Sequence, residues 1–246
     1  MGNGASLFAR YAFPPNELGY CGPSDQEWER DLDGTPIAAE REHIVRQFDG
    51  AWPYLEFIGG YRRMDPLDPR VVEAYWLGSD LLDGIDMLVW GNAIEERFRR
   101  RAGSEWSAME SSIVGGRPTH AYHVFCVYPW VGLLRSGHTD HALRVIDRCR
   151  VRWGTVEDAD GDRIMVASRP LIWDGSTLGL GPAILESVRY RSGGSPLRVG
   201  SAVSLHWDYV CEEFGGTQLA SLARETSRHL AIVNAEQKHL AGVVEA

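Results

Sequence analysis

The stretch Arg148-Cys149-Arg150-Val151-Arg152-Trp153-Gly154-Thr155-Val156 divides the chain into two parts with different hydrophobic periods. Before it, apolar residues recur mostly at the three- and four-residue intervals of a helix. Within it they alternate, so that Val151, Trp153 and Thr155 share one face of an expected strand. A helical part followed by a strand-rich part predicts the α+β class, with the domain boundary near residue 148.

The first part, residues 1–148, is expected to be a helical domain. Its periodicity and capping residues predict helices over 37–48, 70–82, 88–101, 119–134 with an interruption at Pro129, and 140–148. The segment 11–23 is dense in proline, glycine and aromatic residues, which predicts a rigid loop.

The second part, residues 149–246, is expected to be a small β-barrel with a C-terminal helix. Alternating segments predict strands over 150–157, 163–167, 188–190 and 199–209, with 168–173 continuing the second strand past Pro170. Turn residues follow at 158–161 and 192–196, and an amphipathic helix closes the chain at 218–238. A segment of about residues 147–240 is therefore expected to fold on its own.

Composition excludes several classes of protein. A net charge of −9, with 25 basic against 34 acidic residues, argues against a nucleic-acid partner, because such proteins carry a basic face. No run of eighteen apolar residues occurs, so no membrane span is expected. The segment 1–11 has no apolar core typical of a secretory signal, and we expect a cytoplasmic location.

Four cysteines lie far apart and form no CxxC pair, which argues against a structural zinc ribbon. Cys21 lies between Gly19 and Gly22 in the rigid segment and is a candidate catalytic nucleophile. A cysteine on a turn beside helix N-termini can have a lowered pKa. The alternative is a buried thiol in a loop that plugs the helical core.

His120 and His123 stand three residues apart in an expected helix and therefore share a face. They are candidate metal ligands if a carboxylate or thiolate joins them from another element. Cys149 and His206 form a second candidate pair, because a thiolate and an imidazole suit iron or zinc. The alternative for each is a buried side chain without a metal.

The last third of the chain resembles the HypC/HupF family of nickel–iron hydrogenase maturation chaperones. The resemblance is carried by Cys149 followed by a short strand, a turn with Asp160-Gly161-Asp162, and the motif Arg198-Val199-Gly200-x-x-Val203-x-x-His206. It implies an OB-like barrel in which Cys149 and His206 meet around an iron precursor, with their side chains within about 4–6 Å. The whole chain also resembles an actinobacterial family of unknown function, which implies no chemistry.

Two functions follow from these observations. The first is an accessory protein that carries or delivers iron to a metalloenzyme or maturation factor through Cys149 and His206. The second is a cysteine- or metal-dependent enzyme with its site between the helical domain and the barrel, using Cys21 or the pair His120 and His123. A protein partner is expected for the first function, and self-association into a homo-oligomer is compatible with both.

Overall fold

A computed structural model of the chain describes residues 3–23, 38–102, 106–159, 163–190 and 196–244. It is a mixed α+β structure, as the change of hydrophobic period predicts. The helical elements before the first strand are α1 (Gly4–Glu17), α3 (Ala38–Val45), α4 (Trp52–Arg62), α5 (Pro69–Leu77), the 3-10 turn η1 (Asp80–Leu82), α6 (Met87–Ala102), α7 (Trp106–Ile113), α8 (His120–Tyr122), the π-helix η3 (His123–Val127), α9 (Trp130–Arg135) and α10 (Thr139–Cys149).

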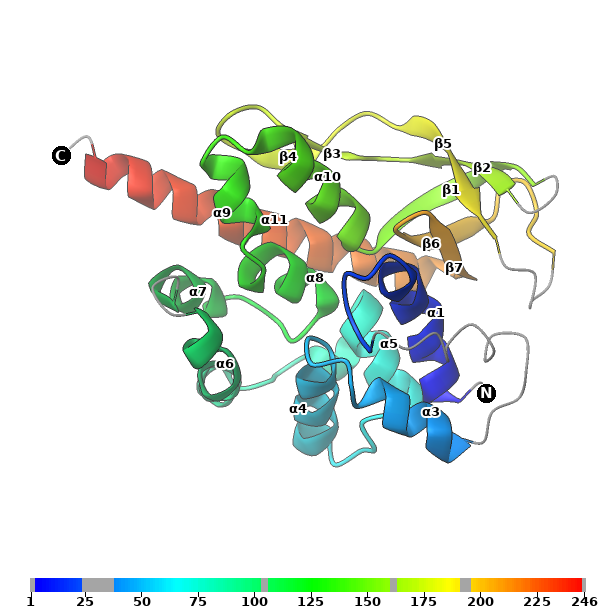
Figure 1. Cartoon of the computed structure of the whole chain (residues 1–246), viewed down its shortest axis with the longest axis horizontal. Helices are drawn as coiled ribbons and strands as arrows, with labels where there is room; N and C mark the ends of the chain where they lie inside the picture. The colour runs from blue at the N-terminus through cyan, green and yellow to red at the C-terminus, as the bar shows by residue number, and fades with distance from the viewer. Residues whose placement is uncertain (1–2, 24–37, 103–105, 160–162, 191–195, 245–246) are drawn as a thin grey trace.

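The strands and the final helix follow in the second part of the chain. They are β1 (Arg152–Asp158), β2 (Arg163–Ser168), β3 (Leu171–Trp173), β4 (Leu178–Leu180), β5 (Ile184–Arg189), β6 (Ala202–His206), β7 (Tyr209–Glu213) and α11 (Gly216–Val244). Five of them hydrogen-bond in the order β1-β2-β5-β7-β6, and β6 pairs back with β1, so this sheet closes on itself. Figure 1 shows α11 running from beside these strands along the length of the molecule to the C terminus.

The rigid segment 11–23 is only partly a loop. Its first seven residues belong to α1, which Asn3 caps by accepting a hydrogen bond from the Ala5 amide at 3.0 Å. Pro14 and Pro15 fall in the last turn of this helix, where their missing amide donors contribute to its end. The predicted loop is therefore wrong for residues 11–17.

Two other predicted elements are divided in the structure. The helix expected over 70–82 ends at Leu77, because Gly78 takes a φ of 78°, and η1 follows separately. The strand expected over 199–209 is a hairpin of β6 and β7, joined at Trp207 and Asp208, and Trp207 has a φ of 52°. Such a turn usually carries glycine, so the apolar Trp207 concealed it in the sequence.

The prediction that segment 168–173 continues β2 is wrong beyond Ser168, where β2 ends. Residues 171–173 form β3, which pairs with β4 in a separate two-stranded sheet. The start of the helix predicted over 37–48, the centre of the turn at 158–161 and most of the loop at 192–196 lie outside the described residues.

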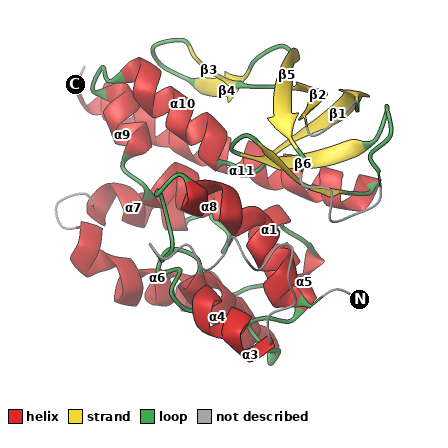
Figure 2. Ribbon diagram, turned by 45° about the vertical axis from the view of Figure 1, so that its right-hand side comes forward, coloured by secondary structure: helices red, strands yellow, loops and turns green. Residues whose placement is uncertain are grey.

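The boundary near residue 148 coincides with the passage from α10 to β1, but the core extends across it. One buried cluster joins Phe8 and Tyr75 of the helices with Val151, Tyr209 and Cys211 of the second part. The first helix packs against β6 and β7, and the Tyr11 hydroxyl lies 3.0 Å from Ser204 Oγ. Figure 2 shows the sheet and the helical group side by side. Whether either part folds alone stays a prediction.

Among the described residues, none of the helices is both long enough and apolar enough to cross a membrane.

Candidate metal centre and cavity

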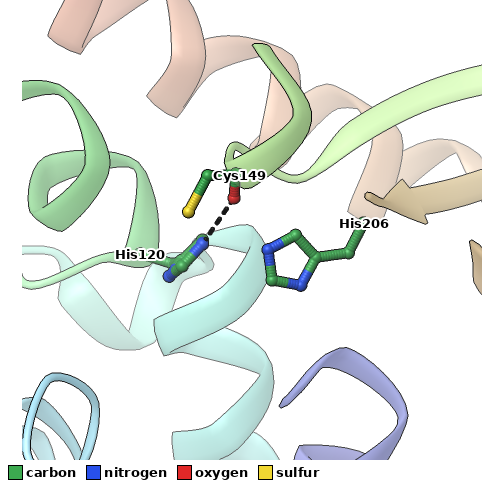
Figure 3. Close-up of side chains that lie close together, drawn as sticks. All are labelled: His120, Cys149 and His206. Carbon is green, nitrogen blue, oxygen red and sulfur yellow. Dashed lines mark hydrogen bonds between the residues drawn. The ribbon is translucent and has the colours of Figure 1, made fainter. Parts of the chain in front are cut away.

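Three buried side chains from three elements converge where the helices meet the closed sheet. His120 opens α8, Cys149 ends α10 and His206 ends β6 (Figure 3). One ligand atom from each lies within 4.8 Å of the other two. The separation of Cys149 and His206 is therefore below the upper limit of about 6 Å expected for this pair. One of the two histidines predicted from the i, i+3 spacing, His120, joins them.

Charged residues fix the backbone around Cys149. Arg150 is almost fully buried, and its Nη2 donates to Asp147 Oδ1 at 3.0 Å. Arg152, equally buried, pairs with Glu186 of β5 and donates to the Trp207 carbonyl, which ties β1 to the β6–β7 turn. Both arginines follow Cys149 closely in the chain, and their partners hold the junction of α10 and β1 in one conformation.

The surroundings of His206 favour a role as a metal ligand. Its Nδ1 donates to the carbonyl of Tyr11 in α1 at 2.5 Å, which leaves the lone pair on Nε2. Nε2 is buried, has no hydrogen-bond partner among the described residues and points toward His120 and Cys149 (Figure 3). Burial lowers the pKa of His206 to about 4, although the Tyr11 and Cys149 carbonyls oppose the shift, so the ring is neutral at pH 7.

His120 is equally enclosed but fully hydrogen-bonded. Its Nε2 lies 2.8 Å from the Cys149 carbonyl, and its Nδ1 lies 3.2 Å from the Tyr75 hydroxyl. The rings of His120 and His206 meet edge to face, with centroids 5.1 Å apart. Burial, followed by the neighbouring His206, holds the pKa of His120 well below its ordinary value. A metal ion would require His120 to release one of its two hydrogen bonds.

The donor set fits a transition metal. Bonds of about 2.0–2.3 Å to nitrogen and sulfur place tetrahedral ligand atoms about 3.3–3.6 Å apart, so an ion would draw these donors together by up to about 1.5 Å. Two imidazoles and one thiolate suit zinc, iron, cobalt or copper rather than magnesium or calcium. The group could therefore hold a metal ion, and its composition alone does not select one.

A cavity of about 140 Å³ opens beside the three donors. Its lining comes from the end of α1 and the following loop, the segment before α4, and α5, α8, η3, α9, α10 and the β6–β7 turn. The residues are Pro15, Tyr20, Cys21, Gly22, Phe48, Gly50, Ala51, Tyr75, Trp76, His120, His123, Tyr128, Pro129, Trp130, Val145, Cys149, His206 and Trp207. Tyr20 stacks on Trp207 at 4.3 Å between centroids. The cavity is thus largely aromatic.

Cys21 lines this cavity but differs from its predicted chemistry. Burial raises its pKa to about 12, whereas a nucleophile would need a lowered value. The reason is its surroundings: the thiol lies among apolar and aromatic side chains, and none of the described residues that line the cavity is Lys or Arg. The expectation of a lowered pKa is wrong, and a catalytic role for Cys21 has no support from its environment.

His123 also lines the cavity, outside the group of three donors. Its Nδ1 lies 3.1 Å from the Tyr54 hydroxyl, while its Nε2 is buried without a partner among the described residues. Burial lowers its pKa to about 3. The segment changes from α-helix to π-helix at this residue, a local irregularity that is frequent at functional sites.

Sequence reasoning missed Tyr75, Trp76, Gly50 and Trp207. The two aromatic residues of α5 follow a helical apolar pattern, so the sequence offers no means of separating them from ordinary core. Trp76 lies close to both histidines, with centroid distances of 4.6 Å to His120 and 5.6 Å to His206. Their place in the cavity lining follows only from the three-dimensional structure.

Comparison with known proteins places residues 1–240 in one family. The chain belongs to DUF6390, a family of unknown function. The match spans both parts of the chain and agrees with the expected resemblance to a family of unknown function. It gives no support to the resemblance to the HypC/HupF chaperones. No curated protein and no solved structure matches the chain.

Proposed function

We propose that this protein is a metal-dependent enzyme that binds one transition-metal ion through His120, Cys149 and His206 and acts on a small molecule held in the adjacent cavity. The observation that carries the proposal is the buried, unpartnered Nε2 of His206 beside a second imidazole and a thiol. An orphaned buried nitrogen costs free energy, and a metal ion would remove that cost.

The number of ligands favours catalysis over a purely structural role. Structural zinc sites use four protein ligands, whereas catalytic sites use three and leave a position for water or substrate. The described residues supply three donors here, and all three line the cavity, so a water molecule or substrate in the cavity could provide a further ligand. The bound ion would supply Lewis acidity, and the surrounding rings would keep bulk water away.

The protein itself would hold its ligands in the required states. His206 is neutral, and the Tyr11 carbonyl fixes its tautomer. Burial raises the pKa of the Cys149 thiol, so this group loses its proton when the ion binds. Tyr75 lines the cavity and its hydroxyl lies 3.2 Å from His120 Nδ1, so it places a hydroxyl group beside one of the candidate ligands.

Metal titration of the full chain tests the proposal. Protein purified without oxygen should contain close to one equivalent of a transition metal. Metal-free protein should bind one Co²⁺ with a sulfur-to-cobalt charge-transfer band. His206→Asn retains a donor for the Tyr11 carbonyl but removes Nε2, and Cys149→Ser removes the soft ligand. Each should weaken binding more than about 100-fold, because even second-layer changes cost 10- to 100-fold.

Cys211→Ser provides the matched control. Cys211 is as buried as Cys149, at 8% exposure, and lies outside the group of three donors. It should leave cobalt affinity and the charge-transfer band unchanged. Absence of cobalt binding, or a band that survives in Cys149→Ser, would contradict the proposal.

The iron-carrier function is the second candidate, favoured by the proximity of Cys149 and His206 at the closed sheet. A carrier must release its cargo to a partner, and the burial of all three donors opposes release. Dialysis of the metal-loaded protein against a chelator of micromolar affinity distinguishes the two. Retention of the ion favours the enzyme, and complete loss favours the carrier.

A further inference from the structure

The cavity contains a second buried nitrogen that has no hydrogen-bond partner among the described residues. His123 Nε2 lies on the wall contributed by η3, at 4% residue exposure, while Nδ1 is engaged by Tyr54. A buried donor or acceptor without a partner is unfavourable, and in a cavity its natural partner is a ligand.

Gly50 leaves space beside His123 Nε2 because it has no side chain. A Cβ added to Gly50 would lie 3.0 Å from His123 Nε2 and 3.7 Å from the Tyr128 hydroxyl. Gly50 is not among the glycines with positive φ, so its backbone does not require glycine. The missing side chain therefore keeps open a polar corner of the cavity, between His123 and Tyr128.

The other residues that line the cavity determine which kind of ligand it could bind. Seven phenylalanine, tyrosine and tryptophan rings line the cavity, and none of its described lining residues is Asp, Glu, Lys or Arg. A charged ligand would lose its hydration without compensation from these walls. A volume of about 140 Å³ is close to the roughly 150 Å³ of an engineered apolar cavity that holds benzene.

We infer that the cavity binds an uncharged, single-ring aromatic compound whose hydroxyl group pairs with His123 Nε2. A hydroxyl both donates and accepts, so it satisfies this nitrogen in either tautomer that Tyr54 allows. The aromatic ring of the ligand then lies among the rings of the wall, where offset and edge contacts are favourable. That this compound is a substrate rests on the proposed function. That it binds rests on the cavity alone.

Calorimetric titration of metal-free full-length protein with phenol, benzene and benzoate tests it. Phenol should bind about tenfold more tightly than benzene, the difference expected from one buried hydrogen bond. Benzoate, which adds a charge, should not bind. Because no metal is present, the result is independent of cobalt binding, and either proposal can fail alone.

Two variants locate the hydroxyl. His123→Phe should remove the preference for phenol over benzene. Gly50→Ala keeps His123 and its bond to Tyr54 but fills the polar corner, and it should weaken phenol binding at least tenfold. Gly132→Ala is the control, since a Cβ at Gly132 would meet nothing within 4 Å. The inference is overturned if phenol does not bind, if benzoate binds as tightly as phenol, or if both His123→Phe and Gly50→Ala bind phenol like the unaltered protein.

Discussion

Cys149 determines how the candidate metal centre responds to pH. Burial, and then the neighbouring Cys21, raises the pKa of its thiol well above the ordinary value, so the thiol is protonated near neutrality. His120 and His206 are shifted downward by burial, and both are neutral there. Of the three donors, only the cysteine must therefore lose a proton when an ion binds.

We predict that cobalt affinity rises about tenfold per pH unit between pH 6 and 8, because one proton is released for each ion bound. The thiol pKa lies above this window and the imidazole pKa values lie below it, so the slope is one throughout. Titrations at several pH values give the slope, and calorimetry in two buffers counts the proton. The Cys149→Ser variant should bind weakly and without this dependence. A slope of two would show that an imidazole is also protonated.

At the scale of the helices and strands, some features follow from local sequence signals and others depend on contacts between distant residues. Residues 87–102 and 139–149 are helical, as their periodicity predicts, because this signal is local. The i, i+3 spacing predicts His120 and His123 as a ligand pair, but only His120 belongs to the group of three donors, and His123 lines the cavity beside it. The change to a π-helix at His123 has no sequence signature. The tautomer of His206 depends on a carbonyl 195 residues away, which no local pattern encodes.

At the same scale, the ion pairs around Glu186 hold β1, β5 and the β6–β7 turn together. Burial raises the pKa of this carboxyl, but Arg152, Ser168 and Arg148 outweigh that effect and leave the pKa below its ordinary value. The side chains of Arg152 and Glu186 are 2% and 8% exposed. The removal of one partner leaves the other as an uncompensated buried charge.

We predict that Glu186→Gln destabilises the protein by about 3–5 kcal/mol, measured as the free energy of unfolding in urea. Glu42→Gln is the matched control, because Glu42 pairs with Arg46 at the surface, where the two side chains are 47% and 49% exposed. It should cost at most about 0.5 kcal/mol. Equal losses of unfolding free energy in the two variants would contradict the prediction, because the buried Glu186 ion pairs would then contribute no more than a surface pair.

At the scale of the molecule, the two parts are joined by polar bonds as well as by a common core. Tyr11 in α1 accepts a hydrogen bond from His206 through its carbonyl, and its hydroxyl contacts Ser204 and Glu212 of the sheet. Tyr209, Cys211 and Phe214 pack in the same buried cluster as the helices. Loss of residues 1–146 would expose these side chains and leave the His206 ring without its carbonyl partner.

We therefore predict that the full chain unfolds in one cooperative transition, with coincident curves from far-ultraviolet circular dichroism and tryptophan fluorescence. Contrary to the expectation from its sequence, the segment 147–240 alone should show no cooperative transition, although its strands close into a sheet. The reason is that its apolar face toward α1 and α5 would be exposed to water. Addition of the separately prepared segment 1–146 should restore the transition, since the missing partners come only from that part. Independent folding of 147–240 would instead establish the boundary near residue 148 as a true domain boundary, and the core across it as an interface between two domains.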